Sequence, residues 1–346
     1  MMIDPKRYTS GRIALANLSA SIERLECGRF ESATSEGLVA LSNLLFLRGD
    51  LLGRIADHDR AEVAAIEAIA LSKDSGTVFY TRARLAERFH RFEEAKELLD
   101  RAQEAGHPTH EIDIERAALL QATGQYSEAL ALREEFAKND PGIHTFGALA
   151  TLLSEMDEWD AAEGRYAVAL DADGGVSPVP CAQLLFEWGV NAMRRGNLER
   201  AEQVFADLDQ VLPAHVPGRG HRAEVALALG QLDVAGALIR PLLESSDDPE
   251  YRATYAEILA AQGDAEAAAM EAKRAAERYE LLLARRPEAY ADHAAFFFMG
   301  VGNRPERAVE LALANWELRD TPRSRSLLDK ALRNSQQASV MPGGVA

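Results

Sequence analysis

The sequence has few cysteines, few aromatic residues and fewer basic than acidic residues. Its two cysteines, Cys27 and Cys181, stand far apart in 346 residues, which excludes a disulfide framework or zinc knuckle and fits a reducing compartment. Aromatic residues make up 7% of the chain, and 38 Lys and Arg stand against 55 Asp and Glu. The net charge of −17 argues against a nucleic-acid partner, because phosphate binding needs clustered basic residues.

Long hydrophobic runs and targeting signals are also missing. The apolar stretch 294–299 is far too short to cross a bilayer, so no membrane insertion is expected. Residues 1–10 are polar and no apolar block follows them, so no secretory signal is visible. We therefore expect a cytoplasmic protein.

Recognisable catalytic and cofactor motifs are nearly absent. The segment 107–111 holds two histidines and a glutamate that could clip a metal, but no further ligand stands nearby, which favours an ordinary turn. The segment 171–182 resembles a calcium loop, yet Ala182 stands where a bidentate glutamate is required. The glycines of 218–220 lack the third glycine and the preceding strand of a dinucleotide fingerprint. We expect a protein that is not an enzyme and holds neither cofactor nor metal.

What the chain does have is a repeat. Small residues recur at intervals of 34, 34, 33, 39, 34, 33 and 40, which is the signature of stacked supersecondary units. These ladder alanines are Ala61, Ala95, Ala129, Ala162, Ala201, Ala235, Ala268 and Ala308.

Further columns accompany the ladder at fixed offsets. Small residues stand twelve places earlier in seven units, and Gly, His, Asp or Asn stands five places earlier in most units, as at Gly124 and His90. Small residues on two helices let their axes approach closely, and the residue between them suits a left-handed helix cap. Each unit is therefore predicted to be a pair of antiparallel helices.

These columns resemble the tetratricopeptide repeat family, and the match is best at 124–130, which reads Gly-Gln-Tyr-Ser-Glu-Ala-Leu and closes at Pro141. Segments 286–293 and 318–323 also look like bacterial repeat proteins of this kind. The resemblance implies an all-α fold, a right-handed superhelical solenoid of about eight helix pairs with flanking N- and C-terminal helices.

The periodicity also suggests boundaries. We expect an N-terminal helical cap over 1–41, the repeat superhelix over 42–320, a C-terminal capping helix over 321–335 and a flexible tail over 336–346. The turn-rich segment 171–180 predicts a slight break in the stack.

In the resembling family the concave groove is lined by the first helix of each unit. Carried onto this chain, that predicts peptide-binding residues Asn43, Phe46, Arg54, Tyr80, Arg84, Arg88, Phe186, Tyr290, His293 and Phe297. His293 is equally compatible with a buried histidine satisfied by Asp292 or by the backbone. A chaperone-type carboxylate clamp is not expected, because Phe46 and Tyr80 stand where that clamp needs Lys or Asn.

A column of arginines stands one place before the small residue of the first helix. Its members are Arg48, Arg82, Arg116 and Arg222. In one interpretation their stems pack between helices and their heads pair with nearby carboxylates. In the other they form an arginine ladder that binds carboxylates or phosphates.

These features predict a non-catalytic scaffold or adaptor that binds a protein or peptide segment in the concave groove. Two alternatives remain open: a chaperone-like assembly or maturation helper for a client protein, and the ligand-sensing part of a regulatory system. No nucleic acid is expected as a partner.

Overall fold

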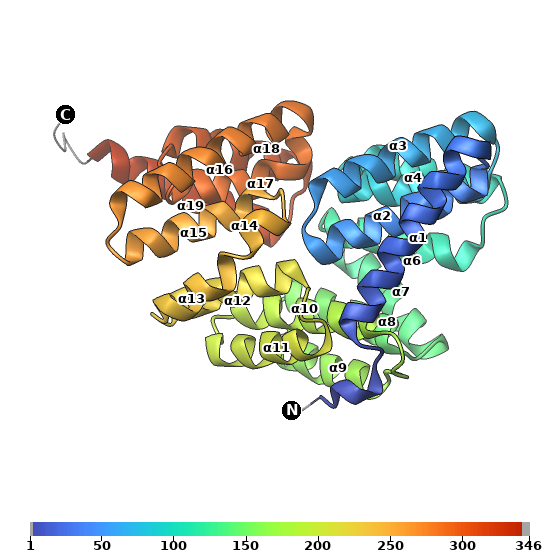
Figure 1. Ribbon diagram of the computed structural model, residues 1–346, viewed down its shortest axis with the longest axis horizontal. Helices are drawn as coiled ribbons and strands as arrows, with labels where there is room; N and C mark the ends of the chain where they lie inside the picture. Colours follow the sequence, from blue (N-terminus) through green and yellow to red (C-terminus); the bar gives the residue numbers. More distant parts are fainter. Residues whose placement is uncertain (1–2, 341–346) are drawn as a thin grey trace.

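The computed structural model describes residues 3–340, and these form an all-α stack of eight helix pairs (Figure 1). The short η1 (Pro5–Arg7) and the helix α1 (Gly11–Ser32) precede the stack, and α19 (Pro322–Val340) follows it. The predicted all-α solenoid is therefore confirmed. The pairs are α2 (Ser35–Leu52) and α3 (Ile55–Leu71), α4 (Gly76–Arg88) and α5 (Phe92–Glu104), α6 (Thr109–Ala122) and α7 (Tyr126–Asn139), α8 (Ile143–Glu155) and α9 (Trp159–Asp171), α10 (Pro178–Arg194) and α11 (Leu198–Val211), α12 (Val216–Ala228) and α13 (Leu232–Ile239) with its short extension α14 (Leu242–Ser245), α15 (Pro249–Ala261) and α16 (Ala265–Arg285), and α17 (Pro287–Met299) and α18 (Pro305–Leu318).

The ladder alanines lie where the two helices of a pair meet. All eight are buried, and none exposes more than 8% of its surface. The turn between the helices adopts the predicted left-handed backbone, with φ +84° at Gly124 and +55° at its non-glycine counterpart His90. A small residue and a left-handed turn at a fixed spacing are what let each unit fold back on itself.

The irregular steps of the repeat have structural causes. The segment after α9 forms a parallel bridge between Val176 and Tyr8, so it holds the N-terminal segment against the stack. The last long step contains α16, a single helix from Ala265 to Arg285.

The ends of the stack differ from the predicted boundaries. The helix α2 already begins at Ser35, so the predicted limit at 41/42 falls inside it. The helix α19 continues to Val340, so residues 336–340 are helical where a flexible tail was expected, and 341–346 lie outside the described residues.

The first and last units touch, which closes the stack on itself (Figure 1). The backbone N–H groups of Ile55 and Ala56, at the start of α3, donate to the Asp247 carboxylate at 2.7 and 3.1 Å. The Arg286 guanidinium pairs with two carboxylates of α3 and lies 3.6 Å from the centre of the Phe89 ring. The periodicity alone did not predict these contacts, because they join units far apart in the sequence.

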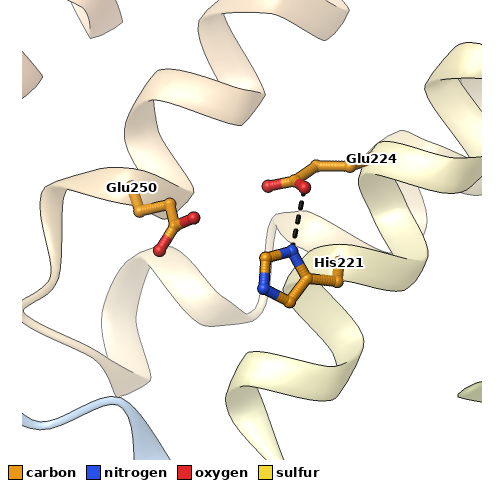
Figure 2. Close-up of side chains that lie close together, drawn as sticks. All are labelled: His221, Glu224 and Glu250. Carbon is orange, nitrogen blue, oxygen red and sulfur yellow. Dashed lines mark hydrogen bonds and ion pairs between the residues drawn. The ribbon is translucent and has the colours of Figure 1, made fainter. Parts of the chain in front are cut away.

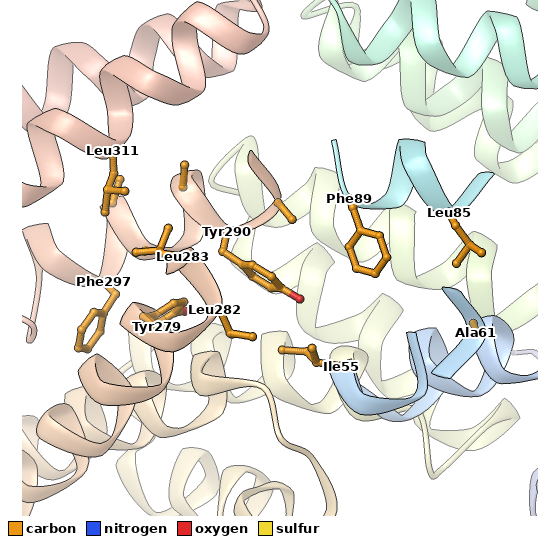
Figure 3. Packing of buried hydrophobic residues seen from close by; sticks show 14 of the residues in the cluster. Ile55, Ala61, Leu85, Phe89, Tyr279, Leu282, Leu283, Tyr290, Phe297 and Leu311 are labelled. Carbon is orange, nitrogen blue, oxygen red and sulfur yellow. The ribbon is translucent and has the colours of Figure 1, made fainter. Parts of the chain in front are cut away.

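Buried apolar side chains also pack at this contact between the first and last units (Figure 3). Ile55 and Phe89 from the first units share one cluster with Leu282 and Tyr290 from the last. Burial of large apolar side chains is the main favourable term in such a contact. The concave face of the stack is thus turned into an interior surface.

The helix α1 lies outside this ring of units and packs on α2. Its Leu15 and Leu18 contact the cluster that includes Leu51 of α2 and Leu212 at the end of α11. Gly11 sits so close to Leu212 that an added Cβ would lie 2.7 Å from the Leu212 Cδ1 atom. No helix within residues 3–340 combines the length and the apolar character needed to span a membrane.

Candidate binding site in the interior of the stack

A polar pocket of about 450 Å³, open to solvent on one side, lies on the inner face of the stack, and we call it the central cavity. Its walls come from α2, α4, α5, α6 and α10, and from the segment that follows α18, so it exists only in the assembled stack. The lining residues are Phe46, Arg84, Glu87, Arg88, His90, Phe92, Glu115, Ala122, Gln183, Glu187 and Arg319.

The three arginines of the central cavity already have carboxylate partners. Arg84 lies 3.2 Å from Glu115 and 5.2 Å from the centre of the Phe46 ring. Arg88 is more loosely held, with its Nε 3.6 Å from an Asp50 oxygen. Arg319 donates to Asp292 at 2.6 Å. Burial alone would raise the pKa of Asp292, but the positive charges of His293 and Arg319 hold it well below its usual range.

Two carboxylates of the central cavity lack a close ion pair, although the charges of Arg84 and Arg133 act on Glu87 and that of Arg194 acts on Glu187. Among residues 3–340, no ion pair forms with Glu87 or Glu187. Burial, together with the charge of Glu115 and a hydrogen bond to it, raises the pKa of Glu87 to about 8. Burial also raises the pKa of Glu187, which accepts a hydrogen bond from the Gln183 amide at 3.2 Å. The ionised form of such buried carboxyl groups is stabilised most when a positive charge enters the site.

A second group of ionisable side chains lies on the inner helices of the last units (Figure 2). We call His221, Glu224 and Glu250, with the adjacent His293, the histidine–glutamate cluster. His221 Nδ1 lies 2.9 Å from Glu224 Oε2, and His293 Nδ1 lies 3.7 Å from Glu250 Oε2. Burial lowers the pKa of His221, but the charge and hydrogen bond of Glu224 outweigh it and raise that pKa to about 9.

The predicted groove residues fall into separate places. Phe46, Arg84 and Arg88 line the central cavity together. Tyr80 lies behind it and donates its hydroxyl to Glu115 at 3.1 Å. The ring centres of Phe186 and His221 are 5.6 Å apart, so Phe186 packs against the histidine–glutamate cluster and does not line the central cavity.

Other predicted groove residues lie at or near the junction between the first and last units. Tyr290 and Phe297 expose only 8% and 4% of their surface and pack in the closing core, so their side chains are not offered to a partner in the closed molecule. Arg54 Nε donates to the Ser245 carbonyl at 3.3 Å, across the same junction. Asn43 is half-buried on α2. His293 is half-exposed beside both Asp292 and Glu250, with its backbone N–H donating to Asp292 at 2.8 Å.

Every member of the arginine column pairs with a carboxylate on the second helix of its own or the preceding unit. The shortest distances are 2.7 Å for Arg48–Asp57, 2.8 Å for Arg82–Glu94, 2.8 Å for Arg116–Asp100 and 2.7 Å for Arg222–Glu202. None of the four lines the central cavity. This arrangement is the one expected of arginines that brace the stack.

The sequence analysis did not list three residues of the central cavity, Glu87, Glu187 and Arg319. They come together only when the stack closes on itself, and that closure leaves no pattern in the sequence. A signal existed for the other cluster, since His221 and Glu224 are spaced i, i+3 and must share a face of one helix. The turn histidine His107 lies 3.1 Å from Glu111 and stacks on Tyr80 with ring centres 4.3 Å apart.

Paired helices, a small-residue ladder and left-handed turns define a repeat protein of the tetratricopeptide type. Among solved structures, the chain is similar to the Cut9–Hcn1 hetero-tetramer of the APC/C (TM-score 0.54, 15% identity), covering 90% of this chain and 58% of that one. It is also similar to yeast Tom70 (TM-score 0.50, 15% identity), covering 90% of this chain and 66% of that one. A tetratricopeptide repeat protein from Parabacteroides merdae is 19% identical over 70% of this chain and 91% of its own, with a TM-score of 0.45.

The sequence comparisons add nothing to this likeness in fold. No protein-family model matches the sequence, and the comparison with curated proteins finds no match. At identities of this level the solved structures define the fold, and the site has to be judged on its own residues.

Proposed function

We propose that the protein is a non-catalytic interaction scaffold that binds a segment of a partner protein against its interior surface, with a Lys or Arg side chain of that segment in the central cavity. The observation that carries the proposal is a cavity of about 450 Å³ in which Glu87 and Glu187, among the described residues, form no ion pair while the arginines beside them are paired with other carboxylates. That volume lies within the range of roughly 300–1,000 Å³ usual for ligand pockets.

The cavity walls suit a long basic side chain. Phe46 offers apolar surface for its methylene stem, while Glu87 and Glu187 offer carboxyl groups that ionise when its positively charged head pairs with them. A carboxylate that is costly to ionise in isolation is stabilised when a cation pairs with it. The net charge of −17 on the whole chain favours the approach of a basic segment.

The environment of the Cys181 thiol argues against its use as a nucleophile. Cys181 is buried, and burial raises its pKa to about 11, so little thiolate forms near neutral pH. Its hydroxyl neighbour Tyr8 donates to Asp173 at 2.7 Å and ties the N-terminal segment to the loop after α9. These groups hold the fold together.

Site-directed photo-crosslinking in the source cell tests the proposal. A photoreactive phenylalanine analogue at Phe46 is expected to capture a partner through a segment that contains Lys or Arg. The same analogue at Val63, which is 49% exposed on α3, serves as the control. Capture at position 63 but not at position 46 would contradict the proposal, and many weakly held clients at position 46 would favour the assembly-helper alternative.

A further inference from the structure

The histidine–glutamate cluster brings together metal-ligating groups from three successive units. His221 and Glu224 lie on α12, Glu250 lies in the first turn of α15, and His293 lies on α17. One ligand atom from each of His221, Glu224 and Glu250 lies within 4.8 Å of the others (Figure 2). We propose that these three residues form a binding site for a divalent transition-metal ion of the zinc class, with His293 as a fourth ligand.

The geometry is close to what such an ion needs. Three atoms 4.8 Å apart have a common point about 2.8 Å from each, while zinc bonds to nitrogen and oxygen are about 2.0–2.2 Å long. Each ligand atom therefore has to move by less than about 1 Å. Rotation of the long glutamate side chains is enough for that movement, and the backbone can stay in place.

The donor set fits this class of ion. Imidazole nitrogen combined with carboxylate oxygen is typical of zinc and of neighbouring first-row metals, whereas calcium and magnesium prefer oxygen alone. With His293 beside Glu250, two histidines and two glutamates would supply the four ligands of a tetrahedral zinc ion.

The surroundings orient the ligands as in a built metal site. Thr254 donates to the second oxygen of Glu224 at 3.3 Å, which leaves the other oxygen facing His221. The rings of Phe186 and His221 are stacked at 5.6 Å, which fixes the plane of the imidazole. Outer contacts of this kind set ligand orientation in metal proteins.

Ordinary ion pairing explains only part of the cluster. His221 and Glu224 form a close pair at 2.9 Å, but Glu250 and His293 stand 3.7 Å apart, beyond hydrogen-bond distance. Glu250 therefore has only the longer contact with His293, and its carboxylate keeps coordination capacity to spare. A metal ion at the common point would satisfy all four groups at once.

Equilibrium dialysis of the chelator-treated full chain against Zn²⁺, with metal content measured by mass spectrometry, tests the proposal. We expect one ion per chain, and a visible d–d spectrum of low-symmetry coordination when Co²⁺ replaces Zn²⁺. Glu250→Gln and Glu224→Gln keep the side-chain shape and are expected to weaken binding at least about tenfold, or about 1.4 kcal/mol. His293→Ala is expected to weaken binding by a smaller factor, and an unchanged affinity would remove it as the fourth ligand.

The control is Glu111→Gln, which removes the carboxylate of the His107–Glu111 pair outside the cluster. Circular dichroism melts check that every variant is folded. Absence of stoichiometric binding to the wild type would overturn the proposal. An equal loss of binding in Glu111→Gln and Glu250→Gln would also overturn it, because binding would then reflect scattered surface carboxylates.

Discussion

The arginine column and the central cavity contain the same kinds of charge, but they use them differently. In the column, each arginine meets a carboxylate of an adjacent second helix at 2.7–2.8 Å. In the central cavity two of the three arginines are held at longer distances, 3.2 Å for Arg84–Glu115 and 3.6 Å for Arg88–Asp50, while Arg319 lies 2.6 Å from Asp292. Glu87 and Glu187 form no ion pair among the described residues.

The difference shows how a stack of similar units can separate structure from binding. Close ion pairs between neighbouring helices are local and recur with the repeat, so they fix the two helices of a unit, or two neighbouring units, against one another. Arg84 and Arg88 are held less closely, and under the proposed function they are the charges that can exchange partners.

The largest expected effect is on stability at the buried end of the column. The side chains of Arg48 and Asp57 are only 11% and 4% exposed, so Arg48→Ala leaves a buried carboxylate without its main partner. We expect a loss of about 3 kcal/mol in the free energy of unfolding, measured by urea denaturation. Arg116→Ala is the control, because its pair with Asp100 is more exposed and should contribute less than about 1 kcal/mol. Equal losses of stability in the two variants would show that burial does not determine how much each ion pair of the column contributes.

The next largest effect is expected at the contact between the first and last units. Asp247 caps α3 from the far end of the chain, and Asp247→Ala is expected to cost about 1–2 kcal/mol. Hydrogen exchange should speed up in residues 55–62. Asp264→Ala removes a cap of α16 within a single unit, so it should cost a similar amount without faster exchange at 55–62. Unchanged exchange there in Asp247→Ala would contradict the closed arrangement.

A smaller effect concerns pH. The pKa of Glu87 is about 8 in the folded chain and near 4.5 when unperturbed, so the folded state binds the proton more tightly. This contribution to stability is full below about pH 4.5 and is lost as the pH rises toward 8. Glu87→Gln should flatten the fall in stability between these values, measured by urea denaturation at several pH values. A slope identical to that of the wild type would contradict the assignment of Glu87 as an uncompensated carboxylate.

The repeat was predictable because it is local. The ladder alanines and the turn residues at Gly124 and His90 each act within one unit, so spacing alone identifies them. The cavity was only partly predictable. Phe46, Arg84 and Arg88 lie on inner helices as the family resemblance implied, but Glu187 and Arg319 join them only through the closure. Contacts such as Ile55–Asp247 join distant units and leave no periodic trace.

Binding of basic peptides to two matched double variants tests the central claim most directly. Peptides selected on the wild type from a random library would be titrated by fluorescence anisotropy. We predict that the selected peptides carry Lys or Arg, that Glu87→Gln with Glu187→Gln weakens binding at least about tenfold, and that Arg82→Ala with Arg116→Ala leaves it unchanged. Binding lost in the arginine variant and retained in the glutamate variant would contradict the account.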